Sequence, residues 1–434
     1  MTASGRRPLL RLTGAASIAA LALTGCAGTG SSGGSSDGDG GPVESLTMWS
    51  SHPGESKPIE TELLEAFEEE SGIEVNLVTA GQNYEEVAQK FNAALSGGDL
   101  PDVVIASDVT WFNFALNDAI TPMDELWETV DVDSEGYVES LREDYEFEGE
   151  HFALPYARST PLFYYNKDMW SAAGLPDRGP ETWDEWAEWA PQLAAANGAV
   201  APMVLPDGTD YLDWYFQGMV WTFGGSYSDE WEMTFTSDET IEAGQFLQDQ
   251  HEQDLIAISN DANNQFGAGQ AAALMQSTGS LKGLTEAAQF EIGTAFLPGP
   301  QPGCPTGGAG LAIPERISDE RKEAAMELIA FLTNTENTVK FSQATGYMPV
   351  RTDAIDSEEM APFLEQNPNF RTALEQLEVT QSQDYARVLL PGGGARIGAA
   401  LDQITIGGQD VETVFEQLQE ESTTVYERDI EPKL

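Results

Sequence analysis

Polar side chains suited to binding a small ligand stand where predicted strands end or predicted helices begin. Tyr84 opens a helical pattern, Asp108 follows an apolar run, and Ser159 joins two extended segments. Thr278 lies in a short hydroxyl-rich turn, and Arg396 follows closely on three glycines. Open α/β sheets bind ligands at the carboxyl ends of their strands, and free amide groups at a helix start attract anions. The pattern therefore predicts a site for a polyol or an anion, with a guanidinium able to hold a phosphate or a carboxylate.

Each of these residues also has a purely structural interpretation. The Ser159 hydroxyl can cap a local turn, and Arg396 can form a surface ion pair in so acidic a chain. Aromatic residues at helical spacing belong more often to a hydrophobic core than to a platform for a sugar. This applies to one cluster in the middle of the chain: Tyr211, Trp214, Tyr215 and Trp221. Spacing alone leaves both interpretations open.

Sequence patterns that carry catalysis or bind a metal do not appear. The three histidines lack the His-Glu-x-x-His spacing of a zinc site: His52, His151 and His251. An acidic stretch at 131–136 begins like a calcium loop, but Arg142 occupies the twelfth position, which requires a bidentate Glu. Gly-x-Ser-x-Gly occurs at 30–34 and 34–38, where no strand precedes it. We therefore expect no enzyme, no metal and no cofactor.

The charge of the chain limits the class of partner. Asp and Glu number 73 against 20 Lys and Arg, for a net charge of -53. Nucleic acid is excluded, because a phosphate backbone requires a basic surface. Acidic blocks such as 65–70 are expected on the outer faces of helices. One hypothesis for the excess is a saline habitat, in which salt screens the self-repulsion of the chain. Thermal unfolding in low and in molar salt tests it.

The start of the chain predicts export and lipid attachment. Residues 1–25 combine arginines with a short apolar run, as in a secretory signal peptide. The sequence Leu-Thr-Gly-Cys ending at Cys26 matches the lipobox of bacterial lipoproteins. Residues 26–42 then form a tether too poor in apolar residues to fold. We expect an extracytoplasmic protein anchored to the cell membrane by lipid. Cys304 is left without a cysteine partner and receives no assigned role.

Hydrophobic periodicity predicts an α/β protein with two lobes. Strands are expected at 45–50, 73–79 and 102–106, with helices at 59–70 and 84–95 between them, which is the order of a doubly wound lobe. Further segments follow the same reasoning: extended pieces meeting at 157–160, a helix capped by Thr182, helices at 211–223, 238–249 and 281–288, strands at 271–276 and 291–297, and mostly helices from 319 onward. About 390 residues beyond the tether exceed what one core usually holds.

Several stretches together resemble the extracellular solute-binding proteins of bacterial ABC importers. These are "LTMWSSHPG", "NYEEVAQKFNAALSGGDLPDVVIAS", "LPYARSTPLFYYNKDMWSAAGL", "TWDEW", "AALMQSTGSL" and "TGYMPVR". The pattern is nearest to the binders of glycerol-3-phosphate and of glycerophosphodiesters. The resemblance implies two hinged lobes around a cleft, which capture a solute by closing and deliver it to a membrane permease. It also implies a monomer.

The resemblance further implies a set of ligand contacts. The phosphate would be held by Ser159, Thr278, Tyr347 and Arg396, and the glycerol or head group would lie near Tyr84, Asp108 and Trp214. Gly308 and Gly310 complete the set. Two departures from the family pattern bear on the ligand: Asp108 stands where Glu is common, and "AALDQIT" replaces an expected Asn-x-Pro-x-Ile-Arg run after Arg396.

Lobe boundaries and two alternative functions complete the expectations. Lobe I would comprise 43–158 and 298–346, and lobe II 159–297 and 347–434. An alternative ligand is a neutral oligosaccharide stacked on Tyr211, Trp214 and Trp221. A different class is a surface hydrolase of glycans or phosphodiesters, since the many carboxylates allow the opposed pair that a glycosidase needs.

Overall fold

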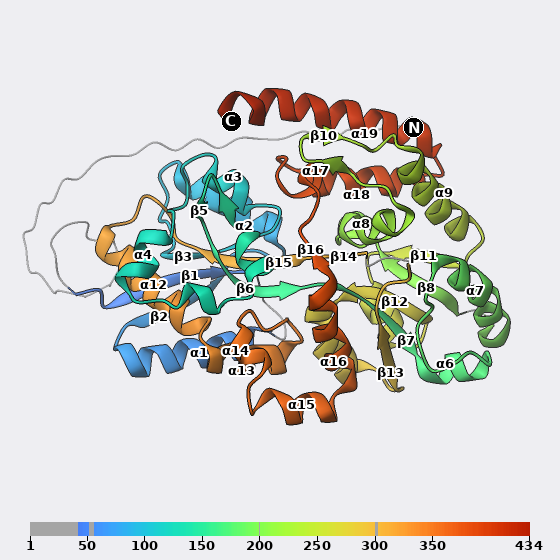
Figure 1. Cartoon of the computed structure of the whole chain (residues 1–434), viewed down its shortest axis with the longest axis horizontal. Helices are drawn as coiled ribbons and strands as arrows, with labels where there is room; N and C mark the ends of the chain where they lie inside the picture. Colours follow the sequence, from blue (N-terminus) through green and yellow to red (C-terminus); the bar gives the residue numbers. More distant parts are fainter. Residues whose placement is uncertain (1–41, 52–55, 199, 300–302) are drawn as a thin grey trace, which may run out of the picture. The chain divides into compact units, whose positions relative to one another are not determined.

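The computed structural model describes residues 42–434, apart from 52–55, 199 and 300–302 (Figure 1). The predicted signal peptide, Cys26 and nearly all of the tether lie outside these residues. Among the described residues, no helix combines the length and the apolar character needed to cross a membrane.

The first sheet has five strands in the order β2-β1-β3-β15-β6. Their bounds are β1 Ser45–Ser50, β2 Glu74–Thr79, β3 Val103–Ser107, β6 Leu154–Ser159 and β15 Gly307–Ala312. The first three strands are parallel, and β15 runs antiparallel to both β3 and β6. The predicted doubly wound order is therefore confirmed for the start of the chain, while β15 makes the sheet mixed.

Helices α1 (Ser56–Ser71) and α2 (Tyr84–Leu95) connect the parallel strands. Leu63, Leu64 and Phe67 of α1 are buried, whereas the glutamates of 65–70 are exposed, as the acidic pattern predicted. Helix α2 begins where Asn83 accepts a hydrogen bond from the backbone amide of Glu86, which satisfies one free donor of the first turn. This cap fixes the position of Tyr84.

The second sheet also has five strands, in the order β11-β8-β12-β7-β13. Their bounds are β7 Pro161–Asn166, β8 Ala201–Pro206, β11 Ile256–Ser259, β12 Ala271–Ser277 and β13 Ile292–Ala295. Strand β7 is antiparallel to β12 and β13, and β8 is parallel to β11 and β12. The predicted Thr182 cap is confirmed, since its hydroxyl accepts from the amide of Glu185 at the start of α7 (Trp183–Asn197).

Three short segments lie at the junction of the two sheets. The chain passes from β6 to β7 through Thr160, and it returns between β13 and β15 by way of β14 (Cys304–Pro305). Strand β14 pairs in parallel with β16 (Thr380–Gln381), a strand inside the region expected to be mostly helical. Figure 1 shows β16 rising between α16 and α17 beside β14. The lobe limits drawn from the sequence remain a prediction.

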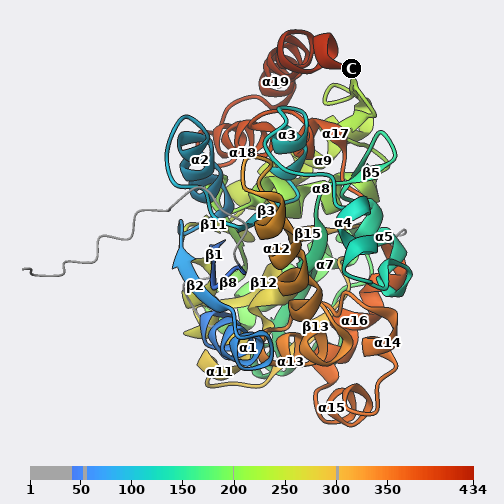
Figure 2. The same ribbon diagram turned by 90° about the vertical axis from the view of Figure 1, so that its left-hand side faces the viewer.

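Helices cover the sheets in separate groups (Figure 2). Helices α12 (Asp319–Leu332) and α13 (Thr335–Thr345) pack against α1 near the first sheet. The other group packs among its own members: α8 Leu212–Phe223, α9 Asp238–Glu252, α18 Gly393–Ile404 and α19 Val411–Val425. Short helices supply the remaining site residues: α3 Trp111–Ala115, α5 Glu139–Glu143 and α17 Tyr385–Val388.

Candidate functional site

A buried guanidinium lies between two carboxylates at the junction of the sheets. Arg387 on α17 donates from Nε to Asp213 on α8 (2.6 Å) and from Nη1 to Asp108 after β3 (3.0 Å). Gln383 donates to the same Asp108 carboxylate and accepts from Arg387. The backbone amide of Asp108 donates to the carbonyl of Gly308 (3.0 Å). The network thus joins the first sheet to α8 and α17.

Burial and mutual attraction set the protonation of this network. Burial by itself would lower the pKa of Arg387, but the carboxylates of Asp213 and Asp108 raise that pKa above its ordinary value. Burial raises the pKa of Asp213 to about 6, although Arg387 pulls it down. Arg387 therefore stays charged, while Asp213 titrates just below neutral pH.

Two tyrosines and a glutamate lie beside this network. The rings of Tyr84 and Tyr211 have centroids 6.4 Å apart. The Tyr211 hydroxyl lies 3.4 Å from a Glu85 carboxylate oxygen. Burial, followed by the charges of Tyr347 and Tyr211, raises the pKa of Tyr84 well above its ordinary value. The Tyr84 hydroxyl therefore keeps its proton, and the Tyr211 hydroxyl donates a hydrogen bond to Glu85.

A second group of hydroxyls lies where β6 passes into β7. Ser159 is buried and is the register partner of Gly307. The amide of Thr160 donates to the Thr278 hydroxyl (3.3 Å), and the amide of Thr278 donates to the Thr160 carbonyl (3.0 Å). Gly279 lies against Tyr347, because a Cβ on it would stand 2.7 Å from that ring.

Glycines bring strand β15 close to its neighbours. Gly308 has φ +95°, and a Cβ there would lie 2.0 Å from the carbonyl oxygen of Ala157. A Cβ on Gly310 would lie 2.7 Å from a backbone oxygen of β6. Trp214 packs on Gly307 and donates from its indole to the Thr306 carbonyl (2.8 Å). These positions accept no larger residue without movement of the strand.

Arg396 is separated from these contacts. Its Nη2 donates to the carbonyl of Pro391 (2.9 Å), and burial lowers its pKa. The charges that act on its pKa are those of Glu421, Arg428 and Asp429. Within the described residues, no hydrogen bond or ion pair links Arg396 to the other predicted site residues. Those other residues lie at or near the junction of the sheets.

Sequence reasoning missed Arg387 and Asp213. Both are buried charges in otherwise apolar segments, "YARVLL" and "YLDWYF". A buried charge requires a charged partner, so an Arg and an Asp in two apolar segments are a usable signal. The run of glycines before Arg396 led the sequence analysis to predict phosphate binding by Arg396 instead of Arg387.

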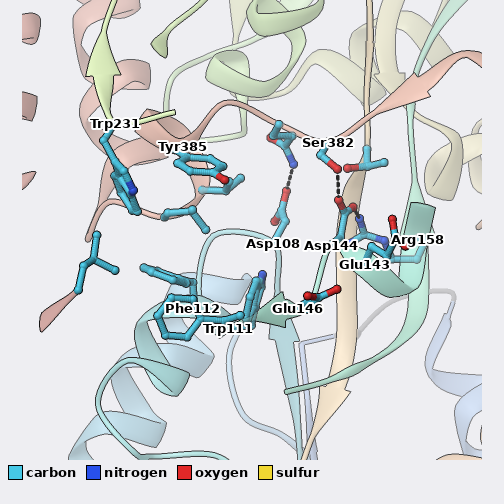
Figure 3. Close-up of a pocket in the computed structure, with 16 residues that line it drawn as sticks. Asp108, Trp111, Phe112, Glu143, Asp144, Glu146, Arg158, Trp231, Ser382 and Tyr385 are labelled. Carbon is cyan, nitrogen blue, oxygen red and sulfur yellow. Dashed lines mark hydrogen bonds and ion pairs between the residues drawn. The ribbon is translucent and has the colours of Figure 1, made fainter. Parts of the chain in front are cut away.

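Two cavities lie near the network, and Asp108 lines the first of them. One has a volume of about 280 Å³ and is lined by Asp108, Arg158 and Gln383 together with aromatic residues of α3, α17 and the turn after β9. Figure 3 shows Asp108 directed into it from one wall. The other has a volume of about 540 Å³ and is lined by Glu85, Val109 and Gly394 among others. Asp108 and Gln383 of the network therefore line the first cavity, whereas the second is bordered by their neighbours Glu85 and Val109.

This arrangement defines a class of protein. Two mixed five-stranded sheets are joined by short segments, and hydroxyl, carboxylate and guanidinium groups lie at their junction. A solute touching both halves stabilises the conformation in which they are closed. The architecture is that of a two-lobed solute-binding protein, as the sequence predicted.

The comparisons with known proteins identify the family. The profile of the family described as bacterial extracellular solute-binding protein matches residues 62–372, more than half of the chain. This chain belongs to that family.

Three known proteins are similar to this chain in sequence or in fold. The sn-glycerol-3-phosphate-binding periplasmic protein UgpB of Escherichia coli is 24% identical over 383 residues, which cover 83% of this chain and 86% of the relative. The crystal structure of UgpB from Mycobacterium tuberculosis in complex with glycerophosphocholine is 49% identical, with a TM-score of 0.87, covering 90% of this chain and 100% of that one. The GacH receptor of Streptomyces glaucescens, solved with acarbose, is 18% identical with a TM-score of 0.77, covering 89% and 99%, and shows the fold alone.

Proposed function

We propose that this protein captures glycerol-3-phosphate or a glycerophosphodiester such as glycerophosphocholine for an ABC importer. The names of the similar UgpB proteins support this ligand class. The observation that carries it is Arg387, a buried cation with Nε and Nη1 engaged by carboxylates and Gln383. Among the described residues Nη2 makes no hydrogen bond, so its two N–H groups can be donated to a phosphate.

In this proposal Arg387 takes the phosphate role that the sequence assigned to Arg396. The remaining predicted contacts keep their roles: hydroxyls of Ser159, Thr278 and Tyr347 donate to phosphate oxygens. Asp108 accepts hydrogen bonds from glycerol hydroxyls, and the glycerol or head group lies near Tyr84 and Trp214. Gly308 and Gly310 keep β15 close enough for its backbone to line the ligand.

Closure converts binding into a signal for transport. The ligand contacts residues on both sheets, so its affinity for the closed form exceeds that for the open form. A membrane permease that recognises the closed form then receives the solute. No bond of the solute is made or broken in this chain, and a monomer suffices.

Calorimetric titration tests the ligand. Glycerophosphocholine and glycerol-3-phosphate should release or absorb heat with one site per chain, and maltose should not. Binding of maltose alone would favour the oligosaccharide alternative, with stacking on Tyr211, Trp214 and Trp221. Incubation with glycerophosphocholine should give no choline and no glycerol phosphate; turnover would assign the protein to the hydrolases instead.

We also propose that the chain is exported and lipidated at Cys26 after removal of 1–25. The lipobox supports this, and two or three acyl chains anchor a protein stably where one chain does not. Expression of wild type and Cys26→Ser in a bacterium with labelled fatty acid tests it. Label and membrane association should be lost in Cys26→Ser, and equal labelling of both would disprove the anchor.

A further inference from the structure

The cavity of about 280 Å³ beside Asp108 has the chemistry of a second binding site. We propose that it binds a small organic ammonium ion, and we call it the aromatic–acidic pocket. It lies between α3 with the hairpin of β4 (Glu146–Phe147) and β5 (Glu150–His151) on one side, and α17 with the turn after β9 (Ser228–Asp229) on the other (Figure 3). The proposal does not depend on the function proposed above.

One wall of the pocket is a continuous row of aromatic rings. Phe147 meets Phe112 edge to face at 5.0 Å, Phe112 lies 6.1 Å from Trp231, and Trp231 meets Tyr385 at 5.0 Å and 63°. The row connects elements near the first sheet to elements near the second. The face of an aromatic ring carries negative charge density and attracts a cation within about 6 Å.

The opposite end of the pocket carries an excess of carboxylates. Asp144 is neutralised by Arg158, which also donates to the Tyr145 hydroxyl at 2.7 Å. Glu143 and Glu146 form no ion pair with any residue that the structure describes, and both line the same cavity. The pocket therefore combines two solvent-exposed carboxylates that have no ion-pair partner with a row of rings, so its field favours a positive occupant.

The side chains that line the pocket favour an organic ammonium ion over an inorganic cation. Nowhere in the described part of the chain are three or more His, Cys, Asp or Glu side chains grouped so as to hold a metal ion. Hard metal ions need several oxygen ligands, which rings cannot supply. An ammonium carrying alkyl groups uses both surfaces, since the carboxylates meet its charge and the rings meet its methyl groups. The volume lies near the lower end for ligand pockets, which limits the occupant to a small one.

Titration with a matched pair of probes tests the proposal. Choline carries the ammonium, and 3,3-dimethylbutan-1-ol has the same shape without the charge. Choline should bind at least about tenfold more tightly at low ionic strength, because cation–π and carboxylate attraction act on the charge alone. Equal binding of the two probes, or binding of neither, would overturn the site.

Variants locate the binding within the pocket. Glu146→Gln and Trp231→Leu should each weaken choline binding by roughly three- to tenfold, the range of one charge or ring contact. Glu150→Gln is the matched control, because Glu150 lies on the paired strand and outside the pocket. Thermal unfolding checks that each variant folds. Loss of affinity in Glu150→Gln equal to that in Glu146→Gln would attribute the binding to general surface charge and reject the proposal.

Saturation experiments identify where the ammonium comes from and separate the two proposals. Choline binding unchanged by excess glycerophosphocholine indicates a free ion. Choline displaced by glycerophosphocholine but not by glycerol-3-phosphate indicates the head group of a diester reaching the pocket. Displacement by both, with no effect of Glu146→Gln, places choline in the central site and overturns the proposal. If glycerophosphocholine does not bind while choline still responds to Glu146→Gln, only the function proposed above fails.

Discussion

Two arginines nine positions apart in the chain lie in opposite surroundings. Arg387 is buried between Asp108 and Asp213, and these partners come from segments 279 and 174 residues away. Arg396 is partly exposed and donates to the carbonyl of Pro391, five residues before it. The position of Arg387 depends on carboxylates from two distant segments of the chain. The position of Arg396 depends only on the loop that precedes it. This contrast supports the proposal that Arg387, and not Arg396, binds the phosphate.

Removal of Arg387 should have the largest effect. Arg387→Ala should lower the affinity for glycerophosphocholine by roughly 100-fold or more, since truncating one member of a buried charge pair costs about 2–5 kcal/mol. Calorimetric titration measures this. Arg387→Lys serves as the conservative control and should recover only part of the affinity, because an ammonium cannot reproduce the fork of a guanidinium. Full affinity in Arg387→Ala would contradict the assignment of phosphate binding to Arg387.

A change in β15 should disturb Arg387 indirectly. Gly308→Ala should lower the free energy of unfolding by about 1–3 kcal/mol from backbone strain, with a further loss from the clash with Ala157. Gly72→Ala is the control, because Gly72 also has positive φ (+77°) but no neighbour within 4 Å. Denaturant unfolding compares them. Ligand affinity should fall only in Gly308→Ala, since the Gly308 carbonyl anchors Asp108; equal effects of the two variants would contradict this.

The pH dependence of ligand binding should reveal the titration of Asp213. Its pKa, raised to about 6 by burial, means that the side chain loses its charge as the pH falls through 6. An uncharged Asp213 competes less for Arg387 and repels an anion less, so the affinity for glycerophosphocholine should rise as the pH falls from 7.5 to 5.5, on the order of three- to tenfold. Calorimetry across this range measures it. Asp213→Asn should bind with little pH dependence, and an unchanged slope in that variant would rule out this assignment.

Removal of Arg396 should have the smallest effect. Arg396→Ala should change the affinity for glycerophosphocholine by less than about twofold and stability by less than about 1 kcal/mol, as expected of a partly exposed residue. The same titration measures both arginines side by side. A loss in Arg396→Ala as large as that in Arg387→Ala would restore the assignment made from the sequence.

Local structure followed from local pattern. The helix predicted at 84–95 has those bounds, Thr182 caps a helix as predicted, and the strand predicted at 271–276 is extended by one residue. These features depend on periodicity and on side chains within a few residues, which a sequence displays directly. The predicted positions of Tyr84 at a helix start and Asp108 after a strand are confirmed for the same reason.

The amino-acid sequence by itself determined the family, the alternation of strands and helices, and most residues at the junction of the sheets. Only the tertiary structure decided that β15 inserts antiparallel between β3 and β6, that β14 pairs with β16, and which arginine meets Asp108. The physical reason is the distance along the chain over which each interaction acts. Periodicity acts over one or two turns of chain, whereas a buried charge selects its partner by position in space, and that position exists only after the sheets have packed.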